Sequence, residues 1–325
     1  MYLYYIMWQW LAYKKGKSLH KTYKFSLCHH VTWGSIQLGS FMYKIAIPFI
    51  FGPAGGGQKS SVAFKKYFGS AWAEEEKREK ISKLMFKFNP ACKTMLKKAK
   101  SILVSNPDTA NAVKAQGLTN YISALDAALP LDFFPENFKT KELKQNTLNL
   151  LWVGRFLPRK GILLILEVME KLKSFPGIKL TVVGDGQQRD LFLESIKEKE
   201  LEKNVIWEGN IPFNEVKTMY QNHDVFFFTS LRDSGPTQLV EAMAYGMPVV
   251  TINIHGQSFI VSDKTGFRCG CETPEQAIEE LYNSILKLYN NQELVTSMSR
   301  EANSFALKQT WQNKIKTVIE QSYPI

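Results

Sequence analysis

Two acidic residues eight positions apart, Asp233 and Glu241, have the chemistry and spacing to hold a polar ligand. They lie in the stretch FFFTSLRDSGPTQLVEAMAYGMPVVT, which predicts an apolar strand, a tight turn, a helix over residues 236–245 and a second strand. We expect Asp233 or Ser234 to cap this helix, which leaves backbone amides at its start free to donate to a ligand. The turn consists of Ser234, Gly235, Pro236 and Thr237.

Glu241 is expected about one turn inside that helix, where its carboxylate can accept hydrogen bonds from two hydroxyls, such as those of a ribose. Most of the surrounding helix is apolar, so we expect it to be buried. A buried glutamate without a partner is costly. A ligand-binding role is therefore favoured over that of an ordinary surface acid.

A second group of candidates follows the strand expected over residues 148–153. Arg155 and Lys160 flank the start of the next helix, where backbone amides and the helix dipole already favour an anion. Arginine can bind a phosphate with two hydrogen bonds, and lysine adds a point charge. The alternative is that Arg155 and Lys160 are ordinary exposed cations of a loop. The phosphate-binding role is favoured because other strand ends indicate the same ligand. One of these ends is a turn that could contact a flat base; it contains Gly209, Asn210 and Ile211.

Apolar strands alternate with amphipathic helices from residue 148 onward. Strands are expected near 148–153, 178–183, 204–207, 224–228 and 248–252, and helices near 161–174, 187–200, 213–221, 236–245 and 274–290. This order predicts an α/β fold with a parallel sheet, in which ligands bind beyond the carboxyl ends of the strands. Residues 130–149 are polar and are expected to link this region to the one before it.

The first part of the chain is less regular. We expect a helix over 1–24, strands over 25–31, 45–51, 101–105 and 121–125, charged helical sequence over 61–100 and a helix over 107–115. The second strand leads into a loop rich in glycine, with Gly55, Gly56 and Gly57. Gln58 stands where a P-loop requires lysine, so a P-loop is disfavoured. A loop that lines a cleft is favoured over a flexible connector.

Composition narrows the possible classes of protein. The 325 residues contain no apolar run long enough to span a bilayer, and four cysteines do not form a disulfide framework or a zinc site. Residues 1–146 hold 22 Lys and Arg against nine Asp and Glu, whereas the rest holds 19 against 21. We expect an anionic partner for the first part, either a membrane surface or a phosphate-linked acceptor, and no nucleic acid, since no binding motif is present.

Both ends of the chain are expected to be helical. The first helix, with its lysine-rich end, is either an amphipathic helix on a membrane surface or an ordinary packed helix. Phe305, Trp311 and Ile315 have helical spacing in residues 304–323 and are expected to pack in a core. A cytoplasmic protein is expected, with peripheral contact at the inner face of the membrane.

These motifs resemble those of glycosyltransferase family 4, and the resemblance is dense over residues 146–305. The family pattern E-x7-E matches at Asp233 and Glu241, followed by A-M-A-Y-G-M-P-V-V. The family's Arg–Lys pair for the diphosphate is similar to V-G-R-F-L-P-R-K-G, and V-V-G-D-G-Q and W-E-G-N-I-P also fit. In the first part, H-H-V-T-W-G-S and I-P-F-I-F-G-P-A-G-G-G-Q resemble a subset of the family that builds bacterial surface polysaccharides.

The resemblance implies a GT-B fold, with two Rossmann-like domains facing across a cleft. It implies an acceptor domain over 1–140, a donor domain over 146–305 and a helix over 306–325 that crosses back. It also implies a retaining hexosyltransferase without metal or cofactor, which moves sugar from a nucleotide-sugar to a lipid-linked or polysaccharide acceptor. Arg155 and Lys160 would neutralise the diphosphate, Asp233 with the turn after it would hold the sugar, and Glu241 the ribose.

Two departures from the family pattern leave other functions open. The opening strand and glycine-rich loop of the family are not found, so the first domain is expected to be incomplete. Gly52-Pro53 stands where many members have a His-Asp pair, and His30 is a weak substitute. The alternatives are an inactive chain that binds nucleotide-sugar and another GT-B enzyme, such as a nucleotide-sugar 2-epimerase.

Overall fold

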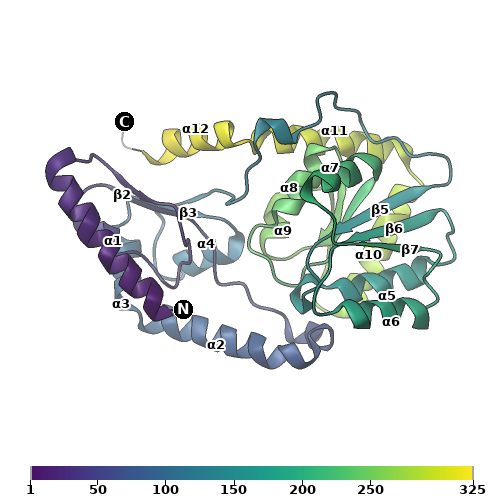
Figure 1. Cartoon of the computed structure of the whole chain (residues 1–325), viewed down its shortest axis with the longest axis horizontal. Coiled ribbons are helices and arrows are strands. Elements are labelled where there is room, and N and C mark those ends of the chain that lie inside the picture. The colour runs from purple at the N-terminus through teal and green to yellow at the C-terminus, as the bar shows by residue number, and fades with distance from the viewer. Residues whose placement is uncertain (1, 324–325) are drawn as a thin grey trace. The chain divides into compact units, whose positions relative to one another are not determined.

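A computed structural model describes residues 2–323, and their contacts divide the chain into two compact units (Figure 1). Unit 1 contains the chain up to Lys59, Ala73–Asp126 and the chain from Gln312. Unit 2 contains Ser60–Trp72 and Ala127–Trp311. Each unit is a mixed α/β structure built on its own parallel sheet, as expected for the fold class.

Unit 1 has a four-stranded parallel sheet in the order β1-β2-β3-β4. Its strands are β1 Cys28–His30, β2 Phe49–Ala54, β3 Ser101–Val104 and β4 Tyr121–Ser123. Its helices are α1 Tyr2–Tyr23, α2 Trp72–Phe88, which begins in unit 2, α3 Pro90–Lys98, α4 Pro107–Lys114 and α12 Trp311–Ser322, which begins at the last residue of unit 2. Phe49, Phe51, Met95, Leu96 and Ile102 form the centre of its core.

Two local features alter the elements expected in unit 1. The strand expected over 45–51 begins only at Phe49, because a 3-10 turn occupies Met42–Ile45 and Ala46 is left-handed, with φ 65°. The helical sequence expected over 61–100 divides at Asn89, whose side chain accepts from Cys92 N at 3.1 Å and caps a new helix that begins at Pro90. Before α2 lie 3-10 turns at Val62–Tyr67 and Gly69–Ala71.

Unit 2 has a six-stranded parallel sheet in the order β10-β9-β8-β5-β6-β7. Its strands are β5 Leu148–Val153, β6 Ile178–Val183, β7 Val205–Gly209, β8 Val225–Phe228, β9 Val249–Ile252 and β10 Gly266–Cys269. Its helices are α5 Ile162–Leu172, α6 Arg189–Glu198, α7 Phe213–Asn222, α8 Thr237–Ala244, α9 His255–Ile260, α10 Pro274–Tyr289 and α11 Gln292–Lys308. The order of the strands reverses beside β5, and ligands of such sheets bind at this reversal.

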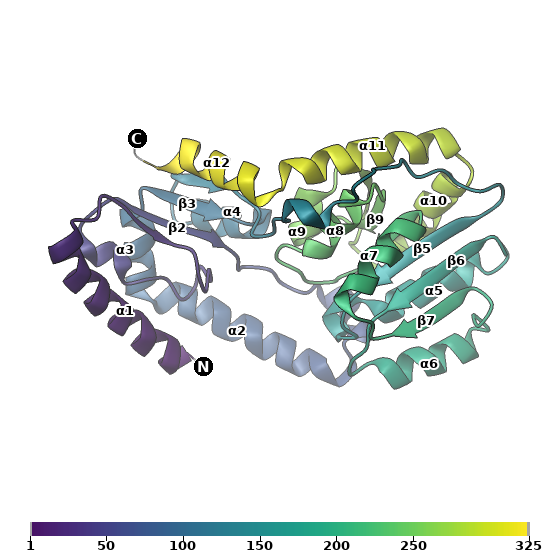
Figure 2. The same cartoon turned by 45° about the horizontal axis from the view of Figure 1, so that its top comes forward.

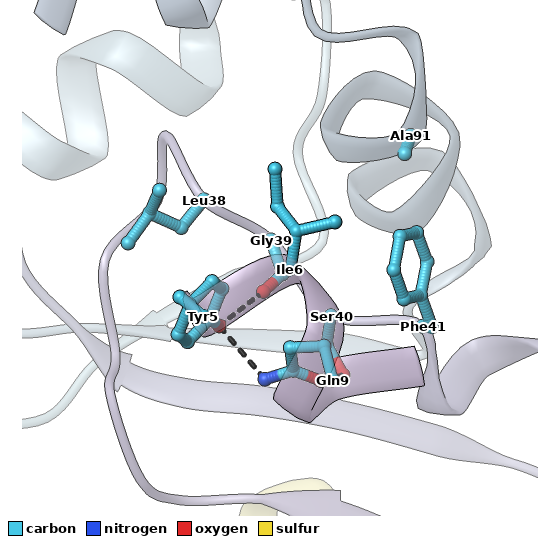
Figure 3. A pocket seen from close by; sticks show the side chains of 8 residues that line it. All are labelled: Tyr5, Ile6, Gln9, Leu38, Gly39, Ser40, Phe41 and Ala91. Atoms are coloured by element: carbon cyan, nitrogen blue, oxygen red, sulfur yellow. Dashed lines mark hydrogen bonds between the residues drawn. The ribbon is translucent and has the colours of Figure 1, made fainter. Parts of the chain in front are cut away.

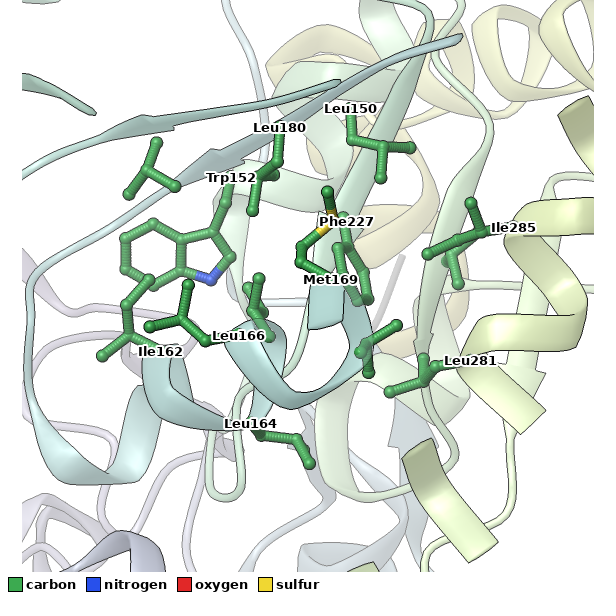
Figure 4. Packing of buried hydrophobic residues seen from close by; sticks show 14 of the residues in the cluster. Leu150, Trp152, Ile162, Leu164, Leu166, Met169, Leu180, Phe227, Leu281 and Ile285 are labelled. Carbon is green, nitrogen blue, oxygen red and sulfur yellow. The ribbon is translucent and has the colours of Figure 1, made fainter. Parts of the chain in front are cut away.

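Helices cover both faces of the unit 2 sheet (Figure 2). On one side, Trp152 and Phe227 of the sheet pack against Leu166 of α5 and Leu281 of α10 (Figure 4). These side chains are fully buried, and each contributes about 1.5–3 kcal/mol relative to an exposed one. The alternation of strands and helices expected from residue 148 onward is therefore confirmed.

Three features of unit 2 and of the last segment of the chain differ from expectation. Strand β10 and the six-residue α9 were not expected, because neither has an apolar run or a full helical repeat. The last segment is two helices, interrupted at Gln309 and Thr310. Core packing was the wrong expectation for Trp311 and Ile315, which are 46% and 53% exposed, whereas Phe305 is half-buried.

Candidate functional site

The turns that follow β5, β6 and β7 are joined through their backbones. Gly184 N donates to Gly209 O at 2.7 Å, and Phe156 N donates to Asp185 O at 2.9 Å. A Cβ on Gly184 would lie 1.8 Å from Gly154 O, so this turn has no room for a side chain. The close approach of the backbones fixes the loop that carries Arg155 and Lys160.

Lys160 is buried at the end of that loop and forms an ion pair with Asp233. The preceding 3-10 turn, Pro158–Lys160, ends at Gly161, where φ is 66° and a Cβ would lie 2.3 Å from Thr229 O. This contact brings the Lys160 ammonium to the end of β8, where it donates to Asp233 Oδ2. Burial lowers the pKa of Lys160, and the charge of Asp233 opposes that shift.

Arg159 is a member of this cluster that the sequence reasoning missed. Its Nη1 lies 3.5 Å from Asp233 Oδ2 and donates to Arg232 O at 3.1 Å. Arg155, assigned to the diphosphate, is exposed and forms no ion pair within residues 2–323, although its charge contributes to the lowered pKa of Lys160. Arg159 adjoins Lys160 in the sequence, and this basic run could have identified Arg159 as a candidate site residue.

The loop from Asp233 to the helix differs from the expected cap. Helix α8 begins at Thr237, its N-cap residue is Pro236, and no side chain caps it. Asp233 instead accepts from Lys160 and, through Oδ1, from Ser234 N at 3.1 Å. The cap expectation is wrong because the carboxylate lies four residues before the helix and is already engaged. Ser234, Gly235 and Thr237 are half-buried.

Helix α9 supports the Asp233 loop from the side. Gly256 N donates to Asp233 O at 3.3 Å, and a Cβ on Gly256 would lie 2.2 Å from Ser234 O. The buried Gln257 donates through Nε2 to Ser230 O at 2.6 Å. The loop therefore has a defined position beside Lys160.

Glu241 is held by a tyrosine of the neighbouring helix. The hydroxyl of Tyr220, a fully buried residue of α7, donates to Glu241 Oε2 at 2.8 Å. Burial raises the pKa of Glu241, and this hydrogen bond partly offsets the shift. No donor in the described part of the chain reaches Oε1. One oxygen is thus positioned, and the other can accept from a ligand.

The expected base-contacting turn lies at the end of the edge strand β7. Gly209 has φ 69° and is the last residue of that strand. Asn210 is exposed and Ile211 half-buried. Contact with a base stays a prediction for this turn.

The glycine-rich loop of unit 1 is bound to its own unit. Gly55 N donates to Gly34 O at 2.7 Å, and Gly56 O accepts from Thr109 Oγ1 at 2.8 Å. A Cβ on Gly56 would lie 2.8 Å from the side chains of Ile36 and Gln37. A 3-10 turn, rather than the α-helix of a P-loop, follows this loop, so the geometry does not support phosphate binding of that kind.

The two histidines of β1 differ in their partners. His29 contacts Tyr323 Oη at 2.9 Å through Nδ1 and Gly52 O at 2.8 Å through Nε2. His30 is buried against Phe51, burial lowers its pKa, and its Nε2 has no hydrogen-bond partner among residues 2–323. His29 therefore has a structural role, while His30 retains an unused nitrogen. Among the same residues, no group of three His, Cys, Asp or Glu could hold a metal ion.

A family model described as "Glycosyl transferases group 1" matches residues 133–305. This range is more than half of the chain, and it contains Lys160, Asp233 and Glu241.

Curated relatives resemble about half of the chain. An uncharacterized glycosyltransferase of Haemophilus influenzae is 31% identical over 185 residues, which are 56% of this chain and 49% of that protein. The poly(ribitol-phosphate) alpha-N-acetylglucosaminyltransferase of Staphylococcus aureus is 27% identical over 171 residues, 52% of this chain and 32% of that protein. The chain spans about half or less of the length of these relatives.

Two solved structures resemble most of the chain. Sucrose-phosphate synthase of Thermosynechococcus elongatus has a TM-score of 0.66 at 17% identity, covering 95% of this chain and 75% of that one. HepE of Anabaena, solved in complex with UDP, has a TM-score of 0.65 at 15% identity, covering 95% and 80%. At these identities the likeness shows the fold alone, which is GT-B.

Proposed function

The chain belongs to the glycosyl transferases group 1 family, and we propose on this premise that it moves a sugar from a nucleotide-sugar donor to an acceptor. The observation that carries the proposal is the cluster of Lys160, Arg159 and Asp233 at the carboxyl end of the unit 2 sheet. A buried cation beside an acid, at the reversal of the strand order, suits a ligand that has both phosphates and hydroxyls.

In this proposal Lys160 and Arg155 bind the diphosphate of the donor, and Arg159 adds positive charge beside them. Lys160 exchanges its carboxylate partner for a phosphate oxygen when the donor binds. Asp233 then accepts from the sugar hydroxyls, which makes it the catalytic residue. Positive charge fixed in a buried site stabilises the charge that develops on the leaving diphosphate. The proposed reaction therefore needs no metal.

The turn after Asp233 completes the proposed sugar site, because Thr237 begins α8 and Gly235 lies two residues before it, so that their amides are available to the sugar. Glu241, positioned by Tyr220, accepts from the ribose hydroxyls through Oε1. The turn at Gly209–Ile211 contacts the base.

We propose retention of the anomeric configuration. The acceptor hydroxyl attacks the anomeric carbon on the face that the diphosphate leaves. The bond between that carbon and the phosphate oxygen breaks, its electron pair stays on the diphosphate, and the hydroxyl proton moves to a phosphate oxygen. This route needs no base from the chain. It needs a site that stabilises the leaving diphosphate, such as the one beside Lys160.

The acceptor we propose is lipid-linked or a polysaccharide. The support is the basic composition of the first part of the chain and the poly(ribitol-phosphate) acceptor named for the S. aureus relative. We place the reaction in the cytoplasm, at the inner face of the membrane. Within residues 2–323, no helix combines the length and the apolar character needed to cross a bilayer.

The test measures three quantities with the full chain: UDP binding by calorimetry, hydrolysis of radiolabelled UDP-sugars, and transfer of label to an extract of membrane lipids and glycans. We expect UDP binding and a transfer rate above the hydrolysis rate. Lys160→Ala should abolish both binding and transfer, whereas Lys171→Ala, which removes an exposed ion pair with Glu279, should change neither.

Each alternative has its own outcome in that assay. UDP binding without transfer identifies a chain that only binds nucleotide-sugar. Interconversion of UDP-N-acetylhexosamines in place of transfer identifies a 2-epimerase. UDP binding that survives in Lys160→Ala contradicts the proposed site.

A further inference from the structure

Helix α1 packs on unit 1 through a stripe of polar and small side chains. Tyr5 and Gln9 are 1% and 2% exposed. Tyr5 Oη donates to Gly39 O at 2.6 Å, and Gln9 Nε2 donates to Tyr5 Oη at 2.8 Å (Figure 3). Two turns later, a Cβ on Gly16 would lie 3.0 Å from Met42 Cε. This stripe fixes which face of α1 is turned inward.

The opposite face of α1 carries its large apolar side chains. They have helical spacing and are exposed: Leu3 84%, Tyr4 59%, Met7 57%, Trp10 41% and Leu11 56%. A helix on the surface of a water-soluble protein shows the reverse arrangement, with its apolar stripe toward the core. The outer face of α1 therefore requires an apolar environment.

A neighbouring residue enlarges this apolar surface. Trp33 is 46% exposed, and its ring centroid lies 6.5 Å from that of Tyr4 on the outer face of α1. Together with the five side chains above, Trp33 forms what we call the α1 surface. Contiguous exposed apolar surface of this kind marks an interaction site rather than a typical solvated face.

Positive charge borders the α1 surface, and the segments that form it contain no acidic residue. The same outer face continues along the helix with Lys14, Lys15 and Lys21. The ammonium groups of Lys14 and Lys44 lie 5.6 and 5.5 Å from the centre of the Trp10 ring. The first 73 residues contain nine lysines and no Asp or Glu.

This charge distinguishes between two occupants of the surface. A second copy of the chain would bring one set of lysines against an identical set, with no acid in the first 73 residues to offset the repulsion. A bilayer of anionic lipid offers apolar chains for Leu3, Met7 and Leu11 and negative headgroups for the lysines. Tryptophan and tyrosine beside lysine suit the boundary between these two layers.

We propose that the α1 surface inserts into the headgroup region of a membrane rich in anionic lipid, with α1 parallel to the membrane plane. The proposal names the membrane partner of the proposed glycosyltransferase. Its test uses neither donor nor acceptor, so its failure is separable from failure of the transferase proposal.

The experiment is sedimentation of the full chain with vesicles of phosphatidylcholine alone or with 30% phosphatidylglycerol. We expect binding to the mixed vesicles, and weaker binding in 0.5 M than in 0.05 M NaCl. Met7→Gln with Leu11→Gln should lower the partition coefficient at least about tenfold, because two inserted side chains become polar. Lys14→Gln with Lys15→Gln should lower it about tenfold on the mixed vesicles only.

The matched control is Leu131→Gln with Leu191→Gln, which alters two side chains of similar exposure in unit 2. It should bind as the unaltered chain does, and Lys160→Ala should do the same. Equal binding to both kinds of vesicle would overturn the proposal, as would full binding by the Met7/Leu11 variant. A dimer in sedimentation equilibrium that the Met7/Leu11 variant converts to monomer, without vesicle binding, would instead identify a second copy as the occupant.

Discussion

Two glycine-containing loops follow buried strands, one in each unit, and they differ in what surrounds them. The loop after β5, residues 154–161, ends at Gly161 and presents Lys160 to an acid from another strand end. The loop after β2, residues 55–57, bonds to its own unit through Gly55 and Gly56. Both contain glycines with positive φ.

The difference shows that glycine marks a close approach of backbone without indicating what approaches. In unit 2 the neighbour of Gly161 is the end of β8, and the contact gathers charged side chains. In unit 1 the neighbours of Gly56 are Ile36 and Gln37, and the contact completes the packing. Ligand chemistry comes from the charged side chains that a loop brings together.

The largest expected difference between the loops is in nucleotide binding. Lys160→Ala should weaken UDP binding at least about 100-fold, because it removes a buried charge-assisted contact with the diphosphate. Lys59→Ala, an exposed lysine beside the unit 1 loop, should change the affinity less than about twofold. Calorimetric titration with UDP measures both. Comparable losses in the two variants would mean that both loops bind the nucleotide.

Glu241 and Tyr220, for which the unit 1 loop has no counterpart, should contribute to binding of the ribose. Glu241→Ala should weaken UDP binding about 10–100-fold, since two hydrogen bonds to a carboxylate are lost. Tyr220→Phe keeps the carboxylate but leaves it without its internal donor, so a loss of about 3–10-fold is expected. Titration with UDP and with UMP tests this ranking. An equal effect of the two variants would assign Tyr220 itself to the ligand.

The affinity for UDP should fall at both acid and alkaline pH. Both losses should come from residues of unit 2. Glu241 accepts hydroxyls when ionised, and its pKa is raised by burial, so affinity should fall as the pH drops through that raised value. Lys160 binds phosphate when protonated, and its pKa is lowered by burial, so affinity should also fall as the pH rises toward 10.5. Glu241→Gln should remove the acid limit, and Lys160→Arg should move the alkaline one upward.

The raised pKa of Glu241 should also make the free energy of unfolding depend on pH. Its folded-state pKa lies above the unfolded value near 4.5, so the folded state binds more protons between the two values. The free energy of unfolding should therefore fall as the pH rises through this window. Glu241→Gln should make that fall smaller in urea titrations.

The smallest expected effect concerns the unit 1 loop itself. Gly56→Ala meets a positive φ, the buried Ile36 Cγ2 and the flexible end of the Gln37 side chain, so it should lower stability by about 1–3 kcal/mol. UDP affinity should stay unchanged. The midpoint of thermal unfolding and the UDP titration measure the two quantities, and a loss of affinity at constant midpoint would assign the loop to the ligand.

Sequence periodicity predicted the unit 2 sheet well because its strands are buried apolar runs between amphipathic helices. It could not predict the pairing of Lys160 with Asp233 or of Tyr220 with Glu241, since each pair joins separate strand ends or helices. The helix cap was mispredicted because a cap residue and an ion-pair acid have the same chemistry. Helical spacing also predicted that Trp311 and Ile315 are buried in a core, whereas both side chains are exposed.

The ion pair of Lys160 and Asp233 must break before the proposed donor can bind to both residues. In the proposed reaction, the donor phosphate would bind Lys160 and the donor sugar would bind the Asp233 carboxylate, so a complete donor would replace both partners of the pair. After transfer, the nucleotide product would offer a phosphate to Lys160 but no sugar hydroxyl to Asp233. Reforming the pair therefore favours departure of the product, so product inhibition should be weaker than donor affinity alone would indicate.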